Sequence, residues 1–287
     1  MKRKVHVALA QMDIKGMEPE ANLKHMCDLI EKIMTEEKAD LVVFPELANS
    51  GYVKSMELAF AKEYVLLAEK IPGNFTKTLS EQAKKYSVYI VSGMLEAHPV
   101  ISPTIFNSAV LIGPSGEVIG VHRKIHLSME EMHYFYRGNT LNVFQTELGN
   151  IGLIVCADAS FPEVSRMLAL KGAEIICCCY AVPKTPGWEF MNERISHIAA
   201  CRAIENICFF IGCNRVGNDA GASFLGWSTI AGPMGQLLAR SESETEEILR
   251  ATFSEEMLRE ARVAFPYFIM RQPNLYSAIV EPTIPKD

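Results

Sequence analysis

Strand-length apolar runs alternate with segments of helical periodicity along most of this 287-residue chain. The clearest helical pattern covers 22–38, where apolar residues recur at spacings of three and four. Short apolar runs on either side of it, 5–11 and 41–44, predict strands. Because strands and helices alternate and hairpins are mixed in among them, we expect an α/β fold in layers, with a mixed sheet or paired sheets.

The remaining expected elements form one continuous unit. No linker, repeat or composition shift divides the chain, so we expect a single domain over residues 1–287, with a C-terminal arm from about residue 258. One hairpin is expected over 106–122 around the turn GPSGE, and another over 227–239 around GPMG. Further strands are predicted at 88–93, 151–155, 174–180 and 207–214, and further helices at 77–86, 161–172 and 190–206.

Composition and charge argue against several classes of protein. The net charge of −6 and the lack of a basic block disfavour a nucleic-acid binder. The longest apolar runs are under about ten residues, so we expect no membrane span, and no signal peptide follows the opening MKRK. Eight cysteines without a C-x-x-C pair fit neither a disulfide framework nor a zinc site. We therefore expect a reducing, cytoplasmic location and neither a metal nor a cofactor.

One of these cysteines, Cys156, stands at a predicted corner between a strand and a helix. The apolar run 151–155 precedes it, and Ser160 and Glu163 have the spacing of a capping box that opens the next helix. A helix N-terminus there favours a thiolate and a developing oxyanion, so Cys156 is a candidate nucleophile. The alternative is a small buried hydrophobe. We assign that core role to the other seven cysteines, which are Cys27, Cys177, Cys178, Cys179, Cys201, Cys208 and Cys213.

Two further strand ends carry polar residues. Glu46 follows the run 41–44 and Pro45, which suggests a partly buried carboxyl with a raised pKa that acts as a general base. Lys124 ends the second strand of the first hairpin, where an ammonium group can stabilise an oxyanion. For each residue taken singly, an ordinary solvated side chain is the alternative.

These residues lie in motifs that together resemble the nitrilase superfamily of carbon–nitrogen hydrolases, over nearly the whole chain. PELANSGY carries the family's glutamate at Glu46, HRKIHL its lysine at Lys124, and CADASFPE its nucleophile at Cys156. EMHYFYRGN resembles the family's E-x-x-x-F-x-x-G element, which selects Glu131 rather than Glu130. FNSAVLIGPSGEV, RAIENICFFIGCNRVG, FLGWSTIAGPMGQLLA and RQPNLY also resemble family segments.

The resemblance implies an αββα sandwich whose catalytic residues meet at one edge of the sheets, and homodimers made partly through the helix after the cysteine. It implies that Cys156 attacks a C–N carbonyl carbon and forms a thioester, while Glu46 transfers protons. Lys124 and the backbone N–H of Ala157 are expected to hold the oxyanion. Glu131 is expected to position Lys124 or the substrate.

The residues after the cysteine bear on the substrate. Nitrile-specific members tend to place Trp directly after the cysteine, whereas Ala157 stands here, which favours amides or carbamoyl compounds. Members that act on carbamoyl-amino acids or dicarboxylic monoamides often place Arg shortly after the cysteine, where Ala159 and Ser160 stand here. Recognition of a carboxylate therefore requires that Lys184 or another basic residue take the place of that arginine. Asp158 matches a common family acid, which we expect to orient the corner.

The proline-containing loop YAVPKTPGWEF follows the next strand, at a place where family members shape the acyl pocket. We expect substrate contacts there from Tyr180, Lys184 and Trp188, with an ordinary surface loop as the alternative. His126 and His133 flank Glu131 without metal-ligand spacing, and we expect structural or solvated roles for both.

The expected function is hydrolysis of a small amide or N-carbamoyl compound to an acid and ammonia. Hydrolysis of a nitrile is one alternative, and transfer of the acyl group to an amine is another, although the acyltransferases of this superfamily carry membrane spans. A catalytically inactive binding subunit is the third alternative. The intact set of Glu46, Lys124, Glu131 and Cys156 argues against it.

Overall fold

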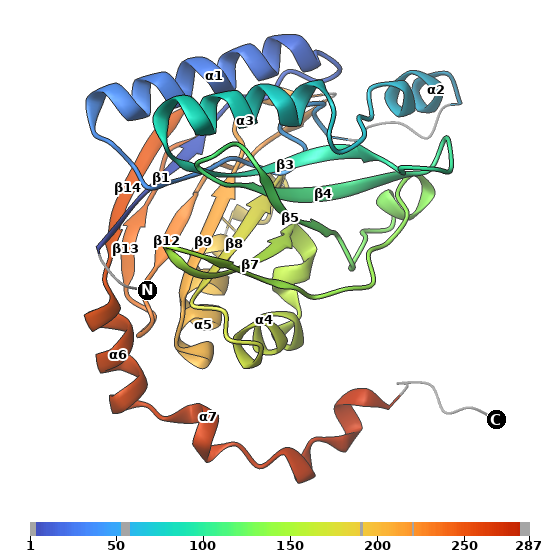
Figure 1. The fold of residues 1–287 in the computed structure, drawn as a ribbon. Coiled ribbons are helices and arrows are strands. Elements are labelled where there is room, and N and C mark those ends of the chain that lie inside the picture. The colour runs from blue at the N-terminus through green and yellow to red at the C-terminus, as the bar shows by residue number, and fades with distance from the viewer. Residues whose placement is uncertain (1–3, 53–57, 190–191, 220, 282–287) are drawn as a thin grey trace, which may run out of the picture.

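The chain folds into two six-stranded sheets stacked face to face, with helices on the outer face of each sheet (Figure 1). The structure is a computed structural model, and it describes residues 4–52, 58–189, 192–219 and 221–281. The first sheet has the order β14-β1-β2-β3-β4-β5, with β1 Val5–Gln11, β2 Leu41–Val43, β3 Tyr89–Ala97, β4 Ile105–Ile112, β5 Val118–Arg123 and β14 Glu247–Phe253. The second has the order β13-β12-β9-β8-β7-β6, with β6 Val143–Thr146, β7 Gly149–Val155, β8 Ile175–Tyr180, β9 Phe209–Asn214, β12 Thr229–Ala231 and β13 Leu237–Arg240. The αββα sandwich expected from the resemblance is confirmed.

Helices α1 and α3 cover the first sheet, and α4 and α5 cover the second (Figure 1). The α-helices are α1 Pro19–Glu36, α2 Leu58–Leu66, α3 Asn74–Tyr86, α4 Pro162–Leu170, α5 Arg194–Asn206, α6 Glu255–Ala264 and α7 Tyr267–Met270. Short 3-10 turns include η1 Glu131–His133 and η2 Cys156–Ser160, and β10 Asn218–Asp219 pairs with β11 Ala222–Ser223.

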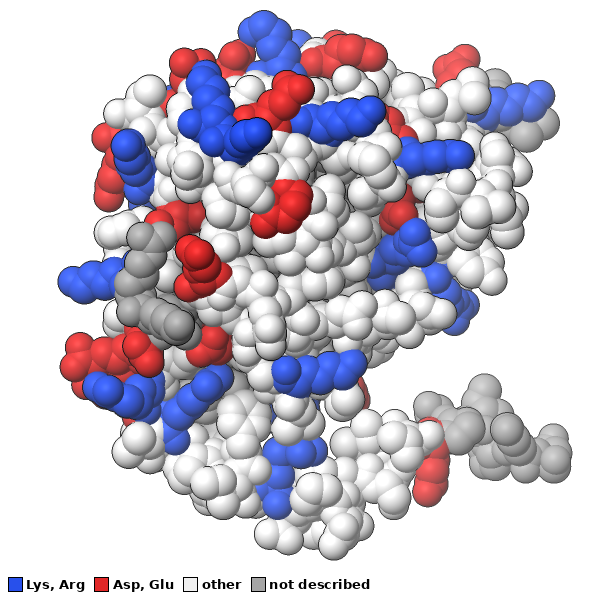
Figure 2. Space-filling model, in the orientation of Figure 1, with Lys and Arg blue, Asp and Glu red and all other residues white. Residues whose placement is uncertain are grey.

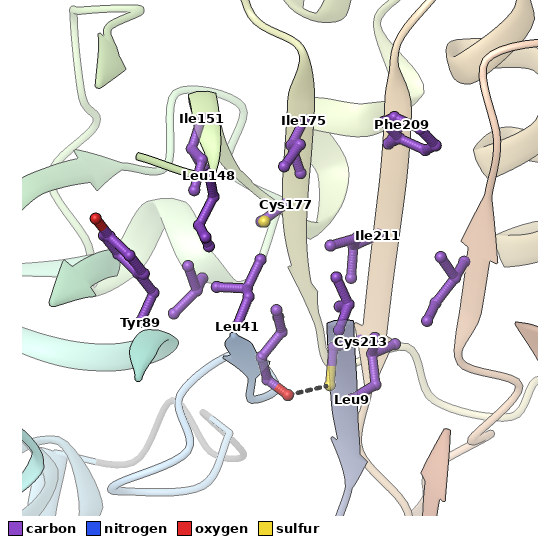
Figure 3. Close-up of a cluster of buried hydrophobic side chains, with 14 of the residues drawn as sticks. Leu9, Leu41, Tyr89, Leu148, Ile151, Ile175, Cys177, Phe209, Ile211 and Cys213 are labelled. Carbon is purple, nitrogen blue, oxygen red and sulfur yellow. Dashed lines mark hydrogen bonds between the residues drawn. The ribbon is translucent and has the colours of Figure 1, made fainter. Parts of the chain in front are cut away.

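The core between the sheets is built from the inward-facing side chains of both. Figure 3 shows Leu9 and Leu41 of the first sheet opposite Ile175, Phe209 and Ile211 of the second. All five are fully buried. Removing this apolar surface from water is the main favourable term that holds the two sheets together.

The three adjacent cysteines of β8 alternate between two cores, as expected for a strand. Cys177 and Cys179 face the inter-sheet core, whereas Cys178 faces the layer of α4 and α5. Cys201 differs from the expected core role: it is exposed on α5, because the helix buries its opposite face through Ala199 and Ala203.

Two expected helix starts also differ from the structure. The proposed capping box of Ser160 and Glu163 is wrong, because α4 begins at Pro162 and Phe161 occupies the capping position without a side-chain hydrogen bond. The proline suits the first helical turn since it needs no N–H partner there. The helix expected over 190–206 begins at Arg194, and residue 190 lies outside the described residues.

After β14 the chain leaves the sandwich through α6 and α7 and continues as an extended arm (Figure 1). This arm carries large apolar side chains in contact with solvent, and Ile269 and Val280 are 86% and 84% exposed. No helix among the described residues is long and apolar enough to span a membrane. On the face drawn in Figure 2, acidic and basic side chains are interspersed over the surface.

Replacing Gly93 with alanine should disturb both the fold and the position of Glu46. A Cβ atom at Gly93 would lie 2.5 Å from the Glu46 Cα and 2.5 Å from the Pro45 carbonyl oxygen, which are backbone atoms that cannot swing aside. We expect a loss of about 2 kcal/mol in the free energy of unfolding, measured with urea, together with a fall in activity.

Gly152→Ala is the matched control, because its Cβ would meet only the flexible Leu168 side chain, at 3.0 Å. We expect that variant to stay within about 1 kcal/mol of the wild type. Equal losses in the two variants would contradict this account.

Candidate active site

A buried ammonium group bonds to two carboxylates at one edge of the sandwich. Lys124 Nζ donates to Glu46 Oε1 and to Glu131 Oε1, at 2.7 Å in each case. The lysine side chain is 1% exposed and the two glutamates are fully buried. Asn107 Nδ2 donates to the same two oxygens, at 2.7 and 3.0 Å. Buried charges need pairing of this kind, because desolvation of an unpaired ion costs several kcal/mol (about 3–5 when one partner is removed).

The topology explains why these residues meet. β2 is parallel to β3, β4 is antiparallel to β3, and β5 is antiparallel to β4, so β2 and β5 run in the same direction. Glu46 comes shortly after β2 and Lys124 directly after β5, which places both at the same sheet edge. Glu131 opens η1 and is held by the Ser128 N–H, which donates to its Oε2 at 2.8 Å.

Glu46 is arranged to accept a proton. Its Oε1 accepts from Lys124 and Asn107, whereas its buried Oε2 has no hydrogen-bond partner among the described residues. Burial raises the pKa of the Glu46 carboxyl, and nearby Glu131 raises it further, against the lowering effect of Lys124. The raised pKa expected from the sequence is confirmed, and it suits a group that exchanges protons with a substrate.

Lys124 stays charged in this site. Burial alone acts to lower its pKa, but Glu46, Cys156 and Glu131 oppose that effect and hold the pKa well above its ordinary value. A lysine that is protonated throughout the physiological range can stabilise negative charge but is not available as a base.

Cys156 lies at the sharp corner between β7 and η2. Its φ is 44°, in the left-handed region that a non-glycine residue adopts at a cost of about 1 kcal/mol. Burial raises the pKa of its thiol, and Glu46 raises it further, against the lowering effect of Lys124. The expectation that the corner alone favours a thiolate is therefore wrong: burial and the neighbouring carboxylates outweigh the helix-end dipole. The thiol needs a base at the moment of reaction.

Asp158 fastens this corner to the segment that carries Lys124. Its Oδ1 accepts from the backbone N–H groups of Ile125 and His126 at 3.2 and 2.9 Å, and its Oδ2 accepts from the Val155 N–H at 3.2 Å. The ring of His122 lies 2.8 Å from Oδ2, and that of His126 lies 2.9 Å from Oδ1. These hydrogen bonds outweigh burial and hold the pKa of Asp158 far below its ordinary value. Asp158 orients the corner, as expected, and His126 is a structural partner of it.

A cavity of about 340 Å³ opens in front of Cys156 and Lys124. Ala157 and Tyr180 line it, as expected for substrate contacts. Lys184 and Trp188 are not part of its wall: Lys184 forms an ion pair with Glu244, and Trp188 is 54% exposed. Among the described residues of this loop, Pro183 is the last that lines the cavity. His133 is exposed on η1 and does not line the cavity either.

Several residues of the site were not singled out from the sequence, among them Asn107, Tyr52 and Arg194. Asn107 lies within a quoted segment, but nothing local indicates that it bonds to two glutamates. Tyr52 lines the cavity, and its backbone N–H donates to Asp219 Oδ2 at 3.1 Å. Arg194 lines it from the first turn of α5. No group of three or more His, Cys, Asp or Glu side chains in the described part of the chain is placed to hold a metal ion.

Comparison with known proteins gives consistent matches over nearly the full length. Residues 6–263 match the family model described as carbon-nitrogen hydrolase. A Schizosaccharomyces pombe protein described as probable nitrilase C965.09 is 31% identical over 284 residues, 97% of this chain and 100% of that protein. The omega-amidase NIT2 of Xenopus tropicalis is 30% identical over 288 residues, 96% of this chain and 97% of its own length. The crystal structure of a carbon-nitrogen hydrolase from Helicobacter pylori G27 has a TM-score of 0.88 at 27% identity, covering 98% of this chain and 100% of that one.

The pH profile of the reaction should report the raised pKa of Glu46. As a base, Glu46 works only after losing its proton, so kcat/KM should rise with pH through an apparent pKa above the ordinary 4.5 of a glutamate. Asn107→Ala removes a hydrogen bond that lowers this pKa, so the acidic limb should move to higher pH. A limb below pH 4.5, or a shift to lower pH in the variant, would contradict the assignment. Circular dichroism of both proteins checks that the variant is folded.

Proposed function

This chain belongs to the carbon–nitrogen hydrolase family, and on that premise we propose that it hydrolyses a small amide or N-carbamoyl compound to an acid and ammonia through a thioester on Cys156. The observation that carries the proposal is the buried Lys124, bonded to Glu46 and Glu131 in the wall of the cavity that Cys156 lines. This arrangement combines a nucleophile, a base with a raised pKa and a fixed positive charge.

In the first half of the reaction, the Cys156 sulfur attacks the carbonyl carbon while its proton passes to Glu46 Oε2. Lys124 and the backbone N–H of Ala157 hold the oxyanion of the tetrahedral intermediate. When the intermediate collapses, the C–N bond breaks, Glu46 returns the proton to the departing nitrogen, and ammonia leaves. The acyl group then remains on Cys156 as a thioester.

In the second half, Glu46 takes a proton from water as the water oxygen attacks the thioester carbon. The C–S bond breaks, the carboxylic acid leaves, and the proton returns to the Cys156 sulfur, so the enzyme is restored. Glu131 keeps Lys124 in place through its 2.7 Å hydrogen bond and is a positioning residue.

Hydrolysis of a nitrile is the second candidate function. The S. pombe relative is described as a probable nitrilase, which favours this alternative, whereas the Xenopus relative is an omega-amidase. Ala157 in place of Trp after the cysteine favours amides. Transfer of the acyl group to an amine would use the same thioester, and an inactive binding subunit would have no need of the buried cluster.

Replacing Cys156 with alanine should lower ammonia release by at least about 10⁴-fold, because the nucleophile is lost. Cys201→Ala is the matched control, since Cys201 is exposed on α5, away from the cavity, and that variant should keep wild-type activity. Ammonia is measured with carbamoyl-β-alanine, carbamoylputrescine, monoamides of dicarboxylic acids, simple aliphatic amides and nitriles. Full ammonia release by the Cys156 variant, or turnover of nitriles alone, would refute the proposal.

We also propose a homodimer in the cytoplasm. The exposed apolar side chains of the arm, such as Ile269 and Val280, are a surface that a second copy can bury. All eight cysteines are free thiols, which suits a reducing compartment. Light scattering should give about twice the chain mass of 32.0 kDa, and truncation after residue 265 should reduce the dimer. A monomer at micromolar concentration would contradict the dimer, and periplasmic or secreted protein in fractionated cells would contradict the location.

A further inference from the structure

We propose that Arg194 selects the substrate by binding a carboxylate that a short apolar chain separates from the scissile C–N bond. This inference rests on the proposed amide hydrolysis and narrows its substrate to a class. Two kinds of compound share the required chemistry. Monoamides of dicarboxylic acids carry the carboxylate on an all-carbon acyl chain, and N-carbamoyl amino acids, after ammonia has left, keep it on the carbamoyl group that is bound to Cys156.

The guanidinium of Arg194 is placed in the same cavity wall as the reacting groups. Arg194 lines the cavity together with Cys156 and Lys124, and its side chain is half-buried. It also opens α5, so the positive end of this 13-residue helix lies at the same wall. An anionic group of a substrate in this cavity would lie close to Arg194 and to the N-terminus of α5.

Arg194 has no carboxylate partner among the described residues. Its Nη2 donates to Ser160 Oγ at 2.8 Å, which is a neutral acceptor and leaves most of the five N–H donors of the guanidinium available. Five other arginines pair with carboxylates, namely Arg123, Arg202, Arg215, Arg240 and Arg250. A guanidinium in a cavity wall without a carboxylate partner among the described residues is suited to bidentate binding of an external carboxylate.

The other cations near the cavity, taken from the described residues, do not offer this site. Lys124 already bonds to two carboxylates, and Lys184 pairs with Glu244 outside the wall. The sequence offered Lys184 or another basic residue for binding a substrate carboxylate, and Arg194 therefore takes this role. It approaches from α5, and its contact with Ser160 places it beside the residues that follow Cys156.

The rest of the wall limits the chemistry of the substrate. Val182, Pro183, Ile195 and Ile198 line the cavity with apolar surface, which suits a short methylene chain. The carboxyl group of Glu130 also lines it and repels additional negative charge. The cavity thus favours a substrate with one carboxylate on a short aliphatic chain over a dianion.

The test compares a charged substrate with a neutral one of the same shape. Glutaric acid monoamide carries the carboxylate, and glutaramide replaces that carboxylate with an amide. In Arg194→Ala, kcat/KM for the monoamide should fall by about 100-fold, mainly through KM, while kcat/KM for glutaramide should change by less than about threefold. Arg194→Lys should recover part of the loss, because lysine supplies charge but not the bidentate geometry.

Lys184→Ala is the matched control, since it removes a cation that lies outside the cavity wall. This variant should leave the ratio of kcat/KM for the monoamide to kcat/KM for glutaramide unchanged. N-carbamoyl-β-alanine, measured with the same variants, tells whether the site also recognises the carboxylate when a ureido nitrogen stands in the acyl chain. Equal losses for monoamide and glutaramide in Arg194→Ala, or no loss for any carboxylate-bearing compound, would overturn the inference.

A binding measurement separates this inference from the proposed function. Glutaric acid monoamide is titrated calorimetrically into Cys156→Ala and into the double variant that also carries Arg194→Ala. We expect binding to weaken by at least about 30-fold in the double variant, whether or not the wild type turns the compound over. Equal affinity in the two proteins would overturn the role of Arg194. Strong binding without any turnover by the wild type would instead refute amide hydrolysis.

Discussion

The charge of Lys124 in the interior is the constraint on which the rest of the site depends. An ammonium group that is 1% exposed is stable only if its donors are satisfied, and Glu46 and Glu131 provide that at 2.7 Å. The same hydrogen bonds fix the segments after β2 and β5 and the turn η1 relative to one another. The hydrogen bonds that stabilise the fold at this edge also hold the positive charge of Lys124 in the wall of the cavity.

Cys156 depends on the same cluster. Its raised pKa means that the resting group is a thiol, and the proposed mechanism therefore assigns its activation to Glu46. Glu46 Oε2 has no partner among the described residues, whereas Oε1 is bonded twice, so the proposed mechanism uses Oε2 as the oxygen that accepts the thiol proton. Asp158 completes the arrangement, because it bonds to the backbone on both sides of the site.

Local patterns in the sequence predicted the layers, the hairpin of β4 and β5 and the strand ends that carry polar residues. They could not predict long-range pairings: β14 lies beside β1 although about 240 residues separate them in the chain, and Arg194 reaches Ser160 from another helix. The capping box at Ser160 failed because spacing alone does not say where a helix begins, and here the 3-10 turn η2 intervenes. The charge of Lys184 was visible in the sequence, but its pairing with Glu244 was not.

The central claim is that the cluster turns Cys156 into an acyl-accepting nucleophile. Rapid-quench mass spectrometry during turnover of an amide substrate tests it most directly. The account predicts that the peptide containing Cys156 gains the mass of the acyl group before the acid product accumulates, and that hydroxylamine removes this mass, as expected of a thioester. Formation of the acid at full rate with Cys156 unmodified throughout, or with the acyl group on another residue, would contradict it.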